Sequence, residues 1–176
     1  PAKLSVVSEA ASAAGAFSAV EFVLDASGSM LQRLGGVRRI ELARNALIEL
    51  ARDALPSGTA FALRVFGNKE AGSCRTDLDI PLGPLDRTVA VARIQALQSM
   101  NLAKTPIGAS LVEVSKDLKG ARPPMLVVLV TDGEDDARAG RCPGCKERDA
   151  IRFLGLRVAS LASVSMRRPL HSHRSL

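Results

Sequence analysis

The sequence has few of the side chains that bind nucleic acids by stacking. Its 176 residues include no Trp, no Tyr and five Phe, although aromatic rings are the usual platforms for single-stranded bases. The net charge is +6, but residues 1–136 hold 15 basic and 16 acidic side chains, whereas residues 137–176 hold 9 and 2. Because the main body is close to neutral, we expect no specific binding to nucleic acid.

Long apolar runs are also missing. The longest, Met125 to Val130, has the length of a strand and is far too short to cross a bilayer. We therefore expect no transmembrane segment in this chain. Cysteine is scarce as well, with three residues, which are too few for a disulfide scaffold and leave the redox compartment open.

Apolar runs alternate with amphipathic segments along the chain. Strands are predicted at 20–24, 60–66 and 125–131, with a shorter one at 77–82, and helices at 38–55, 88–97 and 107–118. Strands that alternate with helices are typical of parallel sheets with crossover connections, and continuous apolar strands are covered on both faces. The predicted class is α/β: a doubly wound (Rossmann-like), mostly parallel sheet with helices on both faces.

The predicted helix 88–97 has one apolar face. Its spacing predicts that Val89, Ala92, Ile94 and Leu97 point inward, and Asp86 is a plausible N-cap.

The chain is long enough for one domain, predicted at 18–165, after an Ala/Ser/Gly-rich linker at 1–17 and before a basic tail at 166–176. Beyond residue 137 the pattern weakens, and we expect there only a short helix at 146–154 and a strand at 156–164.

Oxygen-bearing side chains follow two of the predicted strands. Asp25, Ser27 and Ser29 come directly after the first strand, and Asp132 comes after the strand that begins at Met125. Ligands of doubly wound sheets bind outside the carboxyl ends of the strands, and hard cations such as Mg²⁺ prefer oxygen ligands. Taken alone, Asp-x-Ser-x-Ser could equally be a loop that caps the next helix, but the Thr-Asp-Gly that follows the second strand favours a metal site.

These residues resemble the von Willebrand factor type A domain with its metal-ion-dependent adhesion site, as found in bacterial proteins. The family's first motif matches Asp25-Ala-Ser27-Gly-Ser29, its lone threonine matches Thr105, and its last aspartate matches Asp132. The resemblance implies that Ser27 and Ser29 contact a Mg²⁺, Mn²⁺ or Ca²⁺ ion directly. It implies further that Asp25, Thr105 and Asp132 bind the ion directly or through water, and that a partner protein's Asp or Glu completes the shell.

A metal-dependent hydrolase is the less favoured interpretation. Such an enzyme needs a base near the metal, yet both histidines, His171 and His173, lie in the tail. Glu134, Asp135 and Asp136 could serve, but acidic residues at that position are more typical of a solvated rim or a helix N-terminus. We therefore expect no enzymatic activity.

The cysteines admit several interpretations. Cys142 and Cys145 have the C-x-x-C spacing of zinc and redox sites, but the other zinc ligands and the usual redox context are missing. Similar bacterial members often carry a cysteine in each of the loops that contain Cys74 and Cys142, which implies a disulfide from Cys74 to Cys142 or Cys145 at the rim of the site. Three free thiols remain the alternative.

Two functional hypotheses follow from the resemblance. The favoured one is a metal-dependent protein-binding module for adhesion or interaction, part of a larger exported protein in the periplasm or at the cell surface. The alternative is a cytoplasmic adaptor or regulatory subunit of an ATPase machine of the metal-chelatase type. A disulfide would favour the exported protein, whereas reduced thiols would favour the cytoplasmic one. Oligomeric state is left open.

Overall fold

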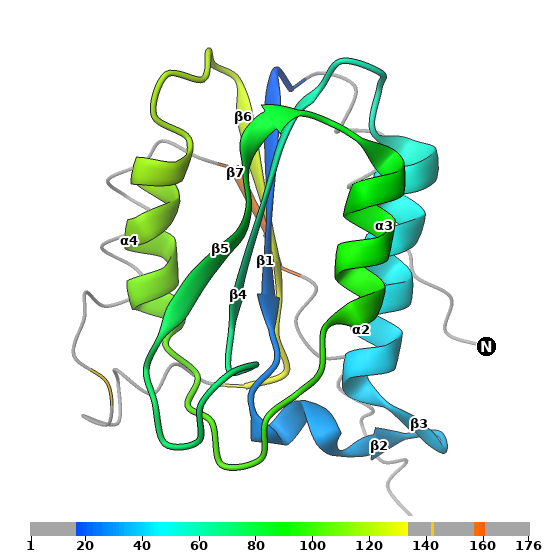
Figure 1. The fold of residues 1–176 in the computed structure, drawn as a ribbon, viewed down its shortest axis with the longest axis vertical. Coiled ribbons are helices and arrows are strands. Elements are labelled where there is room, and N and C mark those ends of the chain that lie inside the picture. Colours follow the sequence, from blue (N-terminus) through cyan, green and yellow to red (C-terminus); the bar gives the residue numbers. More distant parts are fainter. Residues whose placement is uncertain (1–16, 134–141, 143–156, 161–176) are drawn as a thin grey trace, which may run out of the picture.

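A five-stranded sheet forms the centre of the protein (Figure 1). The computed structural model describes residues 17–133, Cys142 and the backbone of residues 157–160. The strand order is β5-β4-β1-β6-β7. The strands are β1 (Ala19–Asp25), β4 (Ala60–Phe66), β5 (Thr76–Pro84), β6 (Met125–Val130) and β7 (Arg157–Ser160).

Strand β1 lies in the middle of the sheet, parallel to both of its neighbours. Its residues pair in unbroken register with β4, from Ala19 opposite Ala60 to Asp25 opposite Phe66. On the other side they pair with β6, from Ala19 opposite Met125. Strand β7 adds in parallel to β6, and β5 runs antiparallel at the opposite edge. The carboxyl ends of β1, β4 and β6 therefore meet at one edge of the sheet, at the bottom of Figure 1.

Helices cover both faces of the sheet (Figure 1). Helix α2 (Arg39–Glu49), which continues into a π-helical turn η2 (Leu50–Ala54), packs with α3 (Arg87–Ala96) on one face, and α4 (Ile107–Asp117) covers the other. Side chains alternate along β1, so that Phe22 joins the core under α2 and α3 while Val23 joins the core under α4. This arrangement is the predicted α/β fold.

The prediction differs from the structure in a few places. Strand β5 is antiparallel, because the chain reverses directly after β4 without a crossover helix. The short 3₁₀ helix η1 (Gly28–Leu31) and the hairpin of β2 (Arg33–Leu34) and β3 (Val37–Arg38) were not expected. Two-residue strands are too short to show a periodic pattern.

The inward face of α3 was predicted in part. Ile94 and Leu97 are buried, and the Asp86 carboxylate caps the helix by accepting the Val89 N–H at 3.0 Å. Val89 and Ala92 are exposed, whereas Ala90 is buried. The face is turned because the helix starts beside an edge strand and packs partly on α2 and η2.

Several of the predicted segments lie near the two ends of the chain. The predicted strand at 156–164 contains β7, but the predicted helix at 146–154, the linker up to residue 16 and the tail at 166–176 lie outside the described residues. Within the described part, no helix is long and apolar enough to cross a membrane.

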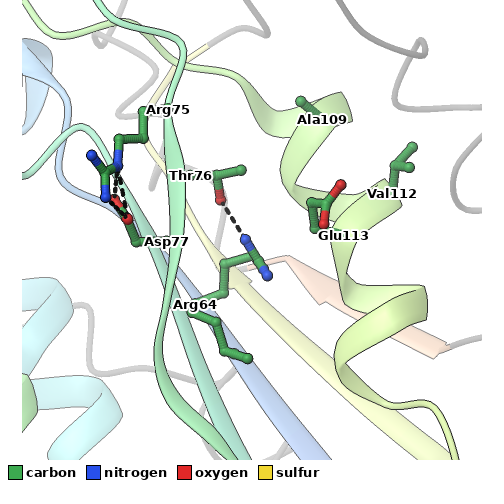
Figure 2. Close-up of a pocket in the computed structure, with 8 residues that line it drawn as sticks. Arg64, Arg75, Thr76, Asp77, Ala109, Val112 and Glu113 are labelled. Atoms are coloured by element: carbon green, nitrogen blue, oxygen red, sulfur yellow. Dashed lines mark hydrogen bonds and ion pairs between the residues drawn. The ribbon is translucent and has the colours of Figure 1, made fainter.

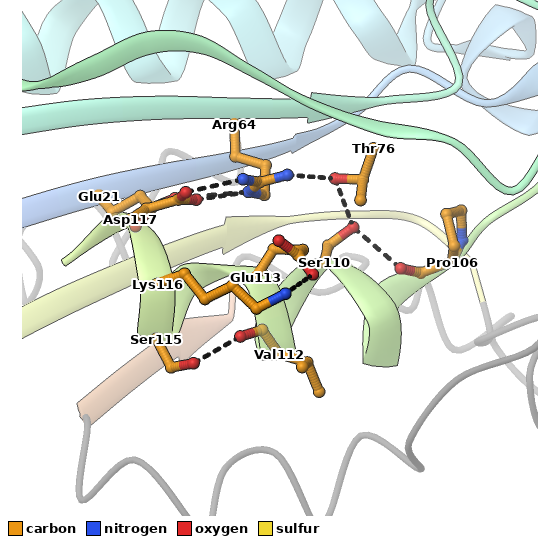
Figure 3. Close-up of polar contacts among 10 residues, drawn as sticks. All are labelled: Glu21, Arg64, Thr76, Pro106, Ser110, Val112, Glu113, Ser115, Lys116 and Asp117. Carbon is orange, nitrogen blue, oxygen red and sulfur yellow. Dashed lines mark hydrogen bonds and ion pairs between the residues drawn. The ribbon is translucent and has the colours of Figure 1, made fainter. Parts of the chain in front are cut away.

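A charged cluster is buried between the sheet and α4 (Figure 3). The Arg64 guanidinium on β4 donates to both Asp117 oxygens at the end of α4, at 2.6 and 2.8 Å. It also donates to the Thr76 hydroxyl at 3.2 Å, and the Ser110 hydroxyl on α4 bonds to Thr76 and to the Pro106 carbonyl at the start of the helix. These bonds tie β4, β5 and α4 together across a face that is otherwise apolar.

Glu21 on β1 completes this cluster, and its carboxylate has only a long ion pair with Arg64 and no hydrogen bond from a described residue. Its side chain is fully buried, and its Oε1 lies 3.8 Å from Arg64 Nε, which is already engaged by Asp117. Neither carboxylate oxygen accepts a hydrogen bond from a described residue. Burial and the neighbouring Asp117 carboxylate raise the pKa of Glu21 from 4.5 to about 9, against the opposing charge of Arg64. At neutral pH Glu21 is therefore a neutral acid that can donate its proton to Asp117.

Glu21 should make the fold less stable as the pH rises. The unfolded chain loses this proton near pH 4.5 while the folded chain keeps it to about pH 9, so ionisation favours unfolding throughout that window. The free energy of unfolding should fall by up to about 1.4 kcal/mol per pH unit. Urea unfolding from about pH 7 to about pH 8.5 tests this, because Asp25, whose pKa is about 6, is mostly ionised over that range.

The matched variant is Glu21→Gln, which keeps the shape and a donor toward Asp117 but cannot ionise. Its stability should be nearly flat over the same pH range. Glu113→Gln removes a carboxylate of α4 that is paired with Lys116; it is the control and should keep the slope of the original protein. An equal slope in Glu21→Gln would show that Glu21 is already ionised in the folded state.

Candidate functional site

Asp25 ends the central strand and is completely buried. Its Oδ1 accepts the Ser27 N–H at 2.8 Å, and its Oδ2 accepts the Thr131 hydroxyl at 2.6 Å. No salt bridge joins Asp25 to a basic side chain in the part of the chain that the structure describes. Burial raises the pKa of Asp25 to about 6, opposed by the hydrogen bonds from Ser27 and Thr131.

The hydroxyl groups of the first motif connect the loops after β1 and β6. Ser27 Oγ lies 3.2 Å from Ser29 Oγ, and Ser29 Oγ donates to Asp132 Oδ1 at 2.7 Å. Ser29 belongs to the 3₁₀ helix η1, which follows β1 and leads into the hairpin of β2 and β3. Residues that lie 103 positions apart in the sequence are thus in direct contact.

Thr105 lies at the same place, in the loop before α4. A Cβ atom on Gly133 would lie 3.9 Å from Thr105 Oγ1 and 3.9 Å from Ser29 Oγ. Gly133 follows Asp132 directly, so the threonine, the serine and the aspartate loop surround one point. Thr105 is also largely buried. The structure therefore brings together all five residues that the sequence singled out, namely Asp25, Ser27, Ser29, Thr105 and Asp132.

Two contacts at the site were missed by the sequence analysis. The sequence motif Thr-Asp-Gly assigns no contact to Thr131, whereas in the structure its hydroxyl donates to Asp25 and accepts the Gly133 N–H at 3.2 Å. Arg39, the first residue of α2, forms an ion pair with Asp132 Oδ2. A basic residue in the first turn opposes the helix dipole, and that conflict was the available signal for a role outside the helix.

The five residues form a donor set that fits a hard divalent cation. They supply two carboxylates and three hydroxyls, all oxygen, which is the ligand type that Mg²⁺ and Mn²⁺ prefer. The described residues contain no group of three or more His, Cys, Asp or Glu that could hold a metal, so a zinc-type site is not present among them. The Asp132 carboxylate is already paired with the positive charge of Arg39. A cation here would therefore be held mainly by hydroxyls and would compete with Arg39 for Asp132.

Gly67 begins the loop after β4 and allows that loop to pack against the backbone of Ser27 at the site. Its φ is +75°, and a Cβ atom there would lie 2.5 Å from Ser27 N and 2.7 Å from Ser27 Cα. The carbonyl of Gly67 accepts the Met100 N–H at 3.0 Å, and that N–H also reaches the Ala26 carbonyl at 3.1 Å. Only glycine fits this close approach of two backbones.

A disulfide joins Cys74 to Cys142, in the loops after β4 and β6. Of the two pairings expected for Cys74, the structure therefore has the one with Cys142. Cys145 lies outside the described residues, so its state is not described. The segment beside Cys74 is bonded to the loop before α4, since Lys104 N–H donates to the Ser73 carbonyl at 3.3 Å. The disulfide thus anchors the rim next to Thr105.

A separate cavity of about 600 Å³ opens between β5 and α4 (Figure 2). None of the five site residues lines it. Its walls carry two basic and two acidic side chains, Arg64, Arg75, Asp77 and Glu113, and Arg75 is paired with Asp77 at 2.7 Å. Because these charges balance and Arg64 is already held by Asp117, the cavity favours no class of charged ligand.

The fold and the site together define a class. A doubly wound sheet carries an all-oxygen donor set on the loops after β1 and β6 and before α4, all at the carboxyl edge of the sheet. The family model of the von Willebrand factor type A domain matches residues 20–134. The chain therefore belongs to the von Willebrand factor type A domain family.

The chain is also similar to a bacterial protein and to solved structures. The chain is 34% identical over 126 residues to an uncharacterized protein, YwmD of Bacillus subtilis (strain 168), covering 66% of this chain and 55% of YwmD. The chain thus spans about half the length of that relative.

Two solved structures share the fold. Proximal thread matrix protein 1 of the mussel byssus has a TM-score of 0.62 at 17% identity, covering 82% of this chain and 37% of that protein. The manganese-loaded TRAP protein of Plasmodium vivax has a TM-score of 0.56 at 21% identity, covering 81% and 56%.

Replacing Gly67 by alanine should disrupt the site by destabilising the fold. The new methyl group would collide with the Ser27 backbone, and we expect a loss of about 2–4 kcal/mol in the free energy of unfolding. The matched control is Gly58→Ala, with φ of +83° and nothing within 4 Å of the new atom, which should cost only about 1 kcal/mol. Chemical denaturation measures both, and equal losses would contradict the close approach.

Proposed function

We propose that this protein is a metal-dependent protein-binding module whose cation accepts an acidic residue of a partner protein. The observation that carries the proposal is the hydrogen-bonded chain from Asp25 through Ser27 and Ser29 to Asp132, with Thr105 beside it. These five side chains would hold Mg²⁺, Mn²⁺ or Ca²⁺. Proteins of the von Willebrand factor type A family generally mediate protein interactions, and the manganese-loaded TRAP protein has this fold.

The composition of the donor set supports an acidic partner. The negative charge of two carboxylates balances the charge of a divalent ion but does not exceed it. When bound, the ion therefore supplies an electron-poor coordination position that a carboxylate oxygen can take. The protein's own residues orient the two carboxylates and set the charge at the rim. Thr131 and the Ser27 N–H keep Asp25 oriented, Ser29 orients Asp132, and Arg39 adds a positive charge at the rim.

We propose further that the site binds and does not catalyse. Apart from the five proposed ligands, the side chains described at the site include Thr131 and Arg39, neither of which is a base at neutral pH. The acidic residues Glu134, Asp135 and Asp136, the candidate bases, lie outside the described residues. A hydrolase would be revealed by metal-dependent release of a product.

We also propose that the protein is exported, to the periplasm or the cell surface. The support is the disulfide between Cys74 and Cys142, because disulfides persist in oxidising compartments and are rare in the cytosol. Reduced thiols would favour the cytoplasmic adaptor of an ATPase machine, which has no supporting observation.

Titration of Mg²⁺ or Mn²⁺ into chelator-treated protein should show one saturable site by calorimetry. Binding should vanish in Asp25→Ala and in the double variant Ser27→Ala/Ser29→Ala, because each removes oxygen ligands. Saturating metal should also stabilise the fold by about 2.7 kcal/mol at a concentration of one hundred times the Kd. Absence of binding in a folded protein would overturn the proposal.

Two further variants make the calorimetry specific. Asp79 lies on the edge strand β5, away from the site, and its carboxylate pairs with Arg93 of α3. The variant Asp79→Asn should therefore bind metal like the original protein. Arg39→Gln removes the cation that competes for Asp132 and should tighten metal binding about fivefold. Weaker binding in Arg39→Gln would show instead that Arg39 is needed to position Asp132.

The export proposal predicts the redox state of the protein in its own cells. Protein from acid-quenched cells, then treated with an alkylating reagent, should be modified at Cys74 and Cys142 only after reduction, as read by mass spectrometry. Acid quenching before alkylation prevents oxidation during lysis. Complete alkylation of both cysteines without reduction would support the cytoplasmic adaptor.

A further inference from the structure

Leu102 combines two unfavourable features at the edge of the site. Its φ is +62°, the one positive φ of a non-glycine residue in the described part of the chain, and its side chain is 72% exposed. The left-handed conformation costs a leucine about 1–2 kcal/mol, and exposure of the side chain gives no compensating burial. A single exposed leucine is ordinary on a protein surface, but one held in this backbone conformation is not.

The loop around Leu102 is firmly held in this conformation. The Leu102 carbonyl accepts the Gly72 N–H at 2.9 Å, and its own N–H donates to the Asn101 side chain at 3.0 Å. On either side, Met100 is bonded to the carbonyls of Ala26 and Gly67, and Lys104 is bonded to Ser73. The segment that receives Leu102 is itself anchored next to the Cys74–Cys142 disulfide.

This loop lies directly against the metal-binding motif. A Cβ atom on Gly28 would be 3.0 Å from Leu102 N, and Gly28 stands between the proposed ligands Ser27 and Ser29. The exposed leucine therefore stands at the rim of the proposed coordination site. Figure 1 shows the loop between α3 and α4 running along the same edge as η1 and the ends of β1 and β6.

We propose that Leu102 is an apolar contact for the partner protein, adjacent to the cation, so that the site recognises an acidic residue next to a large aliphatic or aromatic one. The proposal rests on the proposed function, which supplies the contact for the acid. Successive residues of an extended peptide are about 3.3 Å apart, so the apolar side chain should lie one or two positions from the Asp or Glu. The basic side chains Arg39 and Lys104 lie beside the site and favour a partner segment with negative charge.

The experiment is a selection from a display library of random peptides on the immobilised, disulfide-bonded 176-residue chain in Mg²⁺, with elution by a chelator. The eluted peptides should share an Asp or Glu with an aliphatic or aromatic residue one or two positions away. A selected synthetic peptide should then bind Leu102→Asn about tenfold more weakly than the original chain.

The variants separate binding from folding. Asparagine accepts the left-handed conformation, so Leu102→Asn should unfold at the same temperature as the original protein or higher. Val89→Asn is the matched control, since Val89 is 48% exposed on the first turn of α3, at the opposite end of the sheet. It should leave peptide binding unchanged.

The outcomes distinguish the two proposals. Chelator-eluted peptides that share an acid without an apolar neighbour, or that bind Leu102→Asn as tightly as the original chain, would overturn the role of Leu102 and leave the proposed function intact. A selection that yields no chelator-eluted peptides would overturn the proposed function and the role of Leu102 with it.

Discussion

Strand β1 is hydrogen-bonded along its length to β4 on one side and to β6 on the other, and this double pairing determines where every site residue lies. All seven of its residues are buried. A slip of one residue would exchange the faces of the strand, moving Phe22 to the side of α4 and both Glu21 and Asp25 to the side of α2. The position of Asp25 at the edge of the sheet thus depends on apolar packing that begins six residues earlier, at Ala19.

The face of the sheet under α4 contains a group of buried ionisable side chains. Glu21, Arg64 and Asp117 are buried there, and Asp25 is buried at its end. Two charges of this group neutralise each other through the pair of Arg64 with Asp117. Glu21 is neutral because its pKa is raised by burial, and Asp25 is held by hydrogen bonds from a backbone N–H and a hydroxyl. A divalent cation at Asp25 and Asp132 would compensate the remaining negative charge.

The loops at the carboxyl edge support one another by backbone contacts. Gly67 allows the loop after β4 to touch Ser27, Met100 bridges both, and the disulfide fixes the segment to which Leu102 and Lys104 are bonded. Such a rim can hold hydroxyl ligands in place without many charged groups, and it can keep an exposed leucine in an unfavourable backbone conformation. Rigid loops on a rigid sheet are the usual way to preorganise a binding site.

Most of the fold was predictable because its signals are local. The apolar runs of β1, β4 and β6 and the periodicity of α2 and α4 are patterns that neighbouring residues create, and the motif residues Asp25, Ser27, Ser29, Thr105 and Asp132 were recognisable by their order. The antiparallel direction of β5, the hairpin of β2 and β3 and the turned face of α3 were not, since they depend on what packs against them.

The sequence by itself determined the α/β class and the oxygen-rich donor set, because periodicity and side-chain chemistry are properties of the residues alone. Only the tertiary structure decided that Arg39 pairs with Asp132, that Thr131 holds Asp25, that Cys74 bonds to Cys142 and that Leu102 stands exposed beside Gly28. Each of these contacts joins segments that are distant in the sequence, and only the shared edge of a parallel sheet brings such segments together.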